Sequence, residues 1–93
     1  MYPSISIEEF KIKRQETIAI LDVRDKEPFE QNHLSEAFNI PLNELPAKLA
    51  ELDDETTYYV ICTLGIRSNQ ACEFLAQEGY DVVNVEGGMQ TYH

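Results

Sequence analysis

The sequence predicts a three-layer α/β domain in which a central, mostly parallel sheet is flanked by helices. Short apolar runs rich in β-branched residues recur along the chain, as expected of strands buried on both faces of a parallel sheet. Segments with helix caps or helical spacing separate these runs, and such alternation favours a parallel sheet. Because 43% of its 93 residues are hydrophobic, the chain can bury one core, and residues 1–93 are expected to form a single domain.

The N-terminal segment predicts a helix followed by a strand. Residues 6–9, Ser-Ile-Glu-Glu, fit a capping box in which the Ser6 hydroxyl accepts a backbone hydrogen bond and Glu9 reaches back. A helix is therefore expected from Ile7 to about Arg14. The run Ile18–Leu21 then predicts a central strand.

The next segment predicts a helix, a strand and a further helix. Asp25 is expected to cap a helix that tolerates Pro28 in its first turn, and Ala37–Ile40 predicts a second strand. Asn43 is expected to cap the helix after it. The apolar face of that helix is marked by leucines at steps of four and three: Leu45, Leu49 and Leu52.

The last segment predicts two strands on either side of a helix. Tyr58–Ile61 is the third strong strand and Val82–Val85 the fourth. Between them, Ser68–Glu78 is expected to be helical, and Gly79 stands at the stop position that needs a left-handed backbone.

Composition excludes several classes of partner. Seven Lys and Arg against 17 Asp and Glu give a net charge of −10, which repels phosphate backbones and anionic lipids. Nucleic acid and membrane are therefore not expected as partners. The longest apolar run, Tyr58–Cys62, is far too short to span a bilayer, and the N-terminus lacks a secretory signal pattern, so a cytoplasmic location is expected.

The cysteines do not indicate a metal site or a disulfide scaffold. Cys62 and Cys72 lie ten positions apart, without a CxxC pair or a neighbouring histidine cluster. No metal is expected, and both thiols are expected to be reduced.

The segment around Cys62 is the strongest candidate for chemistry. Cys62 follows the third strand, and ligands bind at the carboxyl ends of parallel strands. The loop leads from Cys62 into a helix, so its amides and the positive end of the helix dipole can converge on the sulfur as a thiolate. Gly65 gives the loop backbone freedom. Arg67 is the only Lys or Arg between Leu49 and His93, a stretch with eight acidic residues.

A structural interpretation of the same residues is also available. Cys62 could be an inert, buried strand residue, and Arg67 an exposed residue at the start of a helix. For an isolated cysteine that interpretation would be the better one, but the combination of cysteine, glycine, arginine and helix start favours the chemical one.

Three ordered motifs resemble the rhodanese-like domain family. The loop CTLGIRS, residues 62–68, resembles the family's CxxGxRS active-site loop. Residues 20–42 are similar to its LDVRxxxEFxxGHIxGAxNIPL signature, and Gly87-Gly88 follows the last strand as in the family. Asn32 and Glu36 stand where glycines are usual, and Tyr92 stands where a tryptophan is common. The resemblance covers about Ile5 to Tyr92.

The resemblance implies a sulfurtransferase that moves sulfane sulfur from thiosulfate or a persulfide donor to a thiol or cyanide acceptor. Cys62 would carry the persulfide, without a metal or organic cofactor. The substrate-binding residues implied are those of the loop: Thr63, Leu64, Gly65, Ile66, Arg67 and Ser68. For Ser68, capping of the helix is favoured over donation by the hydroxyl. The loop is shorter than the HCxxxxxR loop of the related phosphatases, which favours sulfur over phosphate chemistry.

Substrate and alternative functions follow from the same residues. Because the loop is nearly uncharged and the surface acidic, weak use of thiosulfate is expected, with a small-molecule or protein persulfide as donor and a thiol as acceptor. The alternative is a non-catalytic interaction, sulfur-carrier or redox-sensing module that uses the same cysteine.

Three other polar residues and one cysteine are expected to have structural roles. Asp22 and Arg24 are expected to form an ion pair or loop hydrogen bonds, and His33 to fix a turn by a hydrogen bond. Cys72 is expected to pack in the core, although it could resolve an oxidised Cys62 as a disulfide.

Overall fold

Five strands form one parallel sheet in the order β1-β5-β4-β2-β3, which confirms the predicted parallel α/β fold. The computed structural model describes residues 1–92. The strands are β1 (Ser4–Ile5), β2 (Ala19–Asp22), β3 (Ala37–Asn39), β4 (Thr57–Ile61) and β5 (Asp81–Val85). The helices are α1 (Ile7–Lys13), α2 (Lys26–Gln31), α3 (Ile66–Gln77) and two 3₁₀ segments, η1 (Leu42–Glu51) and η2 (Met89–Thr91).

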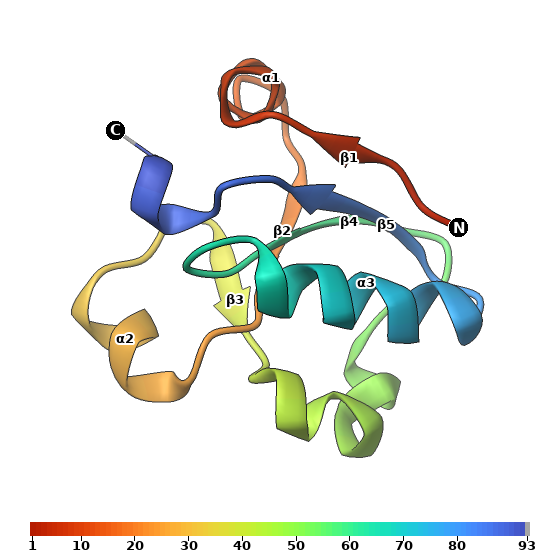
Figure 1. Cartoon of the computed structure of the whole chain (residues 1–93). Helices are drawn as coiled ribbons and strands as arrows, with labels where there is room; N and C mark the ends of the chain where they lie inside the picture. Colours follow the sequence, from red (N-terminus) through yellow and green to blue (C-terminus); the bar gives the residue numbers. More distant parts are fainter. Residues whose placement is uncertain (93) are drawn as a thin grey trace.

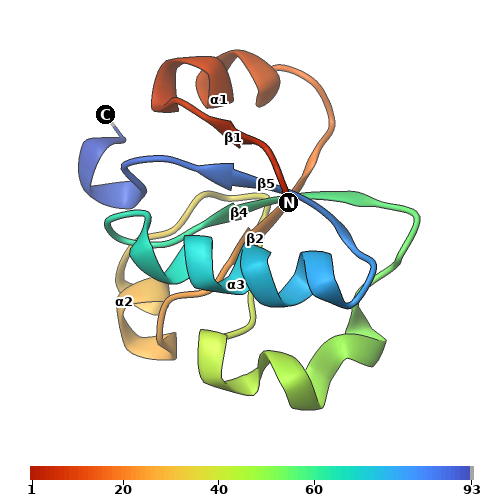
Figure 2. The same ribbon diagram turned by 45° about the vertical axis from the view of Figure 1, so that its right-hand side comes forward.

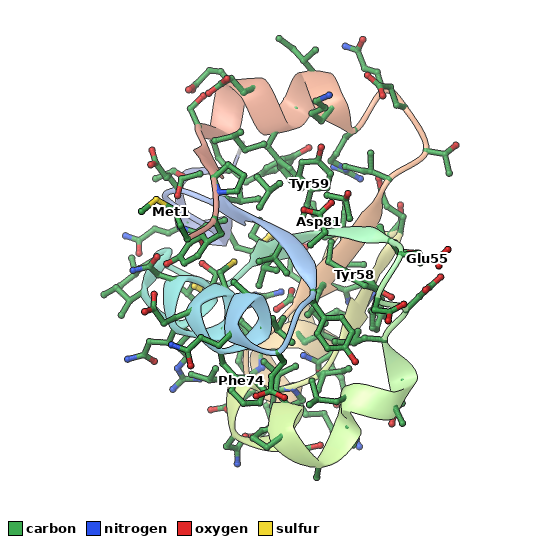
Figure 3. All side chains as sticks on the ribbon, turned by 90° about the vertical axis from the view of Figure 1, so that its right-hand side faces the viewer. Met1, Glu55, Tyr58, Tyr59, Phe74 and Asp81 are labelled. Carbon is green, nitrogen blue, oxygen red and sulfur yellow. The ribbon has the colours of Figure 1, made fainter. Side chains whose placement is uncertain are left out.

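The helices cover the two faces of the sheet unequally. Figures 1 and 2 show α1 and the C-terminal turn above the sheet, with α3, η1 and α2 below it. Because successive residues of a strand point to opposite faces, side chains of β4 pack in the core on both sides of the sheet. Tyr59 packs against the cluster that includes Phe10 of α1, whereas Tyr58 belongs to the cluster that includes Leu45 of η1. Figure 3 shows the side chains of Tyr58 and Tyr59 on β4. The sheet is therefore buried on both faces, as its apolar strands predicted.

The edge strand β1 was not predicted. It has only two residues, too few for a periodic pattern, and it pairs Ser4 with Asn84 and Ile5 with Val85 of β5. The helix after it agrees with the sequence: Ser6 and Glu9 form both hydrogen bonds of the capping box.

The predicted helix over the three leucines is instead the 3₁₀ segment η1. It begins at Leu42 after Pro41, so the prediction that Asn43 caps it is wrong. Pro46 inside the segment has no N–H to donate, and Lys48 has non-helical backbone angles, which explains why a regular α-helix does not form. The apolar face was nevertheless predicted, because all three leucines join the core cluster beneath the sheet.

The helix after Cys62 begins earlier than predicted. Gly65, in a left-handed conformation with φ of 96°, is the N-cap of α3, and Ile66 is its first residue. At the other end Gly79 has φ of 91°, as predicted for a helix stop. None of the helices within residues 1–92 combines the length and apolar character that crossing a membrane requires.

Candidate active site

Cys62 lies at the carboxyl end of β4, at the base of a loop that turns into α3. Its side chain is buried, with 1% of its surface exposed. Two backbone N–H groups donate to its sulfur: that of Gly65 at 3.0 Å and that of Ser68 at 3.2 Å. The first turn of α3 thus directs its free amides, and the positive end of its dipole, at Sγ. This arrangement stabilises negative charge on the sulfur.

The Ser68 side chain takes part in the same arrangement and does not cap the helix. The prediction of a capping role is wrong, because the N-cap is Gly65 and Ser68 is the third residue of α3. Ser68 is fully buried, and its Oγ accepts from the Cys62 thiol at 3.3 Å. When the sulfur is a thiolate, the same hydroxyl can donate to it.

Gly65 is required by the shape of the loop. Its positive φ disfavours any side chain, and a Cβ there would lie 3.1 Å from the backbone nitrogen of Gly87. The loop and the C-terminal glycine pair are therefore packed backbone against backbone.

The C-terminal turn holds the other side of the loop. The N–H of Met89 donates to the Cys62 carbonyl at 2.7 Å, and the N–H of Gln90 donates to the Thr63 carbonyl at 2.9 Å. A Cβ on Gly88 would lie 2.3 Å from the Cys62 carbonyl oxygen. Figure 1 shows this turn beside the loop between β4 and α3. The sequence identified Gly87-Gly88 only through the resemblance to the family. The structure shows that these glycines allow the C-terminal turn to pack against the Cys62 loop.

A pocket of about 370 Å³ opens above Cys62. Its lining combines loop residues with residues that follow β2: Arg24, Asp25, Pro28, Cys62, Thr63, Leu64, Ile66 and Arg67. Leu64 and Ile66 are more than half exposed at its rim. Of the predicted substrate-binding residues, Thr63, Leu64, Ile66 and Arg67 therefore line the pocket, whereas Gly65 and Ser68 contact the sulfur from below.

Arg67 contacts a carboxylate across the pocket. Its Nη1 lies 3.3 Å from Oδ1 of Asp25, and both side chains are about half exposed. Among the described contacts, the guanidinium has no hydrogen bond to Cys62. Asp25 was predicted only as a helix cap; it is the N-cap of α2, but its side chain makes no capping hydrogen bond. Its place in the pocket was missed, because nothing in the local sequence pairs it with Arg67.

The other predicted polar residues form the structural contacts expected of them. Arg24 Nη2 donates to Asp22 Oδ2 at 2.8 Å and to the Asn32 carbonyl at 2.7 Å, and both charged side chains are buried. Asn39 Nδ2 donates to the carbonyls of Asp22 and Arg24. His33 Nδ1 lies 2.8 Å from the Phe29 carbonyl.

Cys72 has the environment of a core residue. It is fully buried on the inner face of α3. Burial, with a smaller contribution from the charge of Cys62, raises the pKa of Cys72 to about 12. Its thiol therefore stays protonated at neutral pH and is a poor nucleophile.

The fold and loop together define a member of the rhodanese-like domain family, and the chain belongs to it. The family's sequence profile, described as "Rhodanese-like domain", matches residues 6–93. The chain is 35% identical over 82 residues to "Putative sulfurtransferase YtwF" of Bacillus subtilis, covering 88% of this chain and 80% of that protein.

Two further relatives extend the comparison. The chain is 38% identical to "Putative sulfur carrier protein YrkF" of Bacillus subtilis, covering 97% of this chain but only half of that protein. The crystal structure of SSP1007 from Staphylococcus saprophyticus superposes with a TM-score of 0.93 at 38% identity, covering 98% of this chain and 93% of that one.

Proposed function

We propose that this chain is a sulfurtransferase that carries sulfane sulfur as a persulfide on Cys62. The observation that carries the proposal is the set of donors around Sγ: two backbone amides at 3.0 and 3.2 Å and the Ser68 hydroxyl at 3.3 Å, at the base of an open pocket. The names of YtwF as a sulfurtransferase and of YrkF as a sulfur carrier support this chemistry. A single domain, residues 1–93, would suffice for it.

In the first step the Cys62 thiolate attacks the outer sulfur of the donor. An S–S bond forms to Sγ while the donor's own S–S bond breaks, and the electron pair leaves with sulfite from thiosulfate or with a thiolate from an organic persulfide. The Gly65 and Ser68 amides hold the attacking thiolate in place. Because they are fixed by α3 before the reaction, they need no reorganisation during it.

In the second step the outer sulfur of the Cys62 persulfide passes to an acceptor. A thiolate or cyanide attacks that sulfur, its bond to Sγ breaks, and the electron pair returns to Sγ as the thiolate. The same donors stabilise this leaving group, so the loop serves both half-reactions. In each step Sγ is either the nucleophile or the leaving group, and neither a metal nor an organic cofactor is needed.

Turnover with cyanide tests the proposal. Thiocyanate formation is measured with thiosulfate and with a small organic persulfide as donors, for the unaltered chain, Cys62→Ser and Cys72→Ala. The proposal predicts that Cys62→Ser abolishes turnover with every donor, while Cys72→Ala keeps it. Unaltered turnover in Cys62→Ser would refute the assignment of the sulfur carrier.

A carrier function is the second candidate, and the name of YrkF favours it. A carrier would load sulfur onto Cys62 and release it to a protein thiol, with slow release to cyanide. Stoichiometric loading of Cys62 without cyanide turnover would assign the chain to this class.

A further inference from the structure

The ion pair between Asp25 and Arg67 lies at the mouth of the Cys62 pocket. Both residues line this pocket, and both also line a neighbouring hollow beside Leu42 and Asn43. The pair joins the residue before α2 to the first turn of α3. Since the Asp25 carboxylate makes no capping bond to α2, its described partner is the guanidinium at 3.3 Å.

Both cations that line the pocket are already paired with a carboxylate. Arg24 is bound by the buried Asp22, and Arg67 by Asp25. Within residues 1–92, the pocket lining therefore offers an anion no unpaired cationic side chain. Its other rim is formed by the uncharged side chains of Leu64 and Ile66.

We propose that Asp25 determines donor specificity, by holding Arg67 so that the site disfavours dianionic donors and accepts organic persulfides with an uncharged organic part. The inference rests on the proposed sulfur transfer and names its substrate class. To bind near Arg67, thiosulfate must either displace Asp25 from the guanidinium or lie beside the Asp25 carboxylate, which repels it. An alkyl persulfide brings no second charge, and its carbon part can lie against Leu64 and Ile66.

Sulfur transfer from an alkyl persulfide needs no reactant other than the Cys62 thiolate and the donor. The Cys62 thiolate attacks the outer sulfur, the S–S bond of the donor breaks, and the electron pair leaves as the alkyl thiolate. The proton of the donor persulfide stays on the transferred sulfur. The leaving group has a single charge, whereas the sulfite released from thiosulfate has two.

The test compares Asp25→Asn with the unaltered chain in single-turnover loading of Cys62. The donors are thiosulfate and 2-hydroxyethyl persulfide, and the loaded protein is measured by mass. Glu27→Gln is the matched control, because it removes the same charge from an exposed position of α2 that does not line the pocket. Asn is itself a good N-cap residue, so the substitution leaves the start of α2 intact.

The proposal predicts that Asp25→Asn raises the rate constant with thiosulfate by about three- to tenfold at low salt, because the guanidinium of Arg67 is then free to attract the dianion. The rate constant with the alkyl persulfide should change by less than about twofold, because that donor lacks the second charge. Glu27→Gln should leave both nearly unchanged. In an Arg67→Gln background the effect of Asp25→Asn on thiosulfate should shrink, because no guanidinium is then released.

Several outcomes would overturn the specificity assignment. An equal change for both donors, no change for thiosulfate, or the same gain in Glu27→Gln would each remove Asp25 as its cause. An undiminished gain in the Arg67→Gln background would assign the effect to the bare charge of Asp25 instead of the ion pair. Failure of Cys62 to load from either donor in every variant would instead refute the proposed function on which this inference rests.

Discussion

Replacing Gly88 by alanine should damage the Cys62 loop from the side of the C-terminal turn. Gly88 has φ of 59° and ψ of −161°, a region that is almost restricted to glycine. A Cβ there would lie 2.3 Å from the Cys62 carbonyl oxygen and 2.6 Å from that of Thr63. Neither contact can be relieved by a side-chain rotation, because both partners are backbone atoms.

The expected loss of stability has two parts. The backbone conformation costs a non-glycine residue about 1–3 kcal/mol. The clash also separates the C-terminal turn from the loop, which breaks the two hydrogen bonds from Met89 and Gln90 at about 0.5–1.5 kcal/mol each. Gly88→Ala should therefore lower the free energy of unfolding by about 2–6 kcal/mol.

Gly79→Ala is the matched control. Gly79 also has positive φ, but a Cβ there meets nothing within 4 Å, so only the backbone cost of about 1–2 kcal/mol applies. Urea unfolding measures both variants, and the rate of Cys62 persulfide formation is measured on the folded fraction. We expect Gly88→Ala to be less stable than Gly79→Ala and to load sulfur more slowly. Equal stabilities together with an unchanged loading rate would refute the argument that this turn supports the loop.

Three further predictions concern single groups. Ser68→Ala removes one donor to the sulfur and should slow loading of Cys62 by about ten- to a hundredfold in single-turnover assays, with little change in urea stability; an unchanged rate would leave the hydroxyl without a catalytic role. The hydrogen bond from Arg14 lowers the pKa of Glu36 to about 2, so this pair stabilises the fold above the ordinary glutamate pKa of about 4.3 and loses that contribution as the pH falls toward 2. Because Glu36 is over a third exposed, Glu36→Gln should cost about 0.5–1 kcal/mol at pH 7, and most of this difference should be lost by pH 2 in urea titrations. A difference independent of pH would exclude the ion pair as its source. The pKa of Cys72 near 12 predicts that iodoacetamide leaves Cys72 unlabelled at pH 8 in the native chain and labels it in urea, whereas labelling of the native chain would contradict its burial.

The architecture was largely predictable because its signals are local. The β-branched runs located β2, β4 and β5 to within about one residue at each end, and the alternation of elements predicted parallel pairing. The two-residue strand β1 depends on its partner β5 and carries no pattern of its own. Leucine spacing identified the buried face of η1, but Pro46 decides its backbone form.

The site was predictable as a segment but not as a set of contacts. Cys62 and its loop stand out in the sequence, whereas the role of Ser68 depends on Gly65 adopting a left-handed conformation that starts α3 earlier. Because serine is favoured as a helix cap, the sequence predicted that role for Ser68. In the structure the tight loop makes Gly65 the cap instead. The pairing of Asp25 with Arg67 joins segments far apart in the chain and is visible only in three dimensions.

The most direct test of sulfur transfer through Cys62 is the mass of the protein, and of its Cys62 peptide, after incubation with a small persulfide under non-reducing conditions. The proposed mechanism predicts one extra sulfur on the Cys62 peptide, removed by cyanide or a thiol and absent from Cys62→Ser. A Cys62 peptide that gains no sulfur from the persulfide or from thiosulfate, while its thiol remains free and alkylatable, would contradict it.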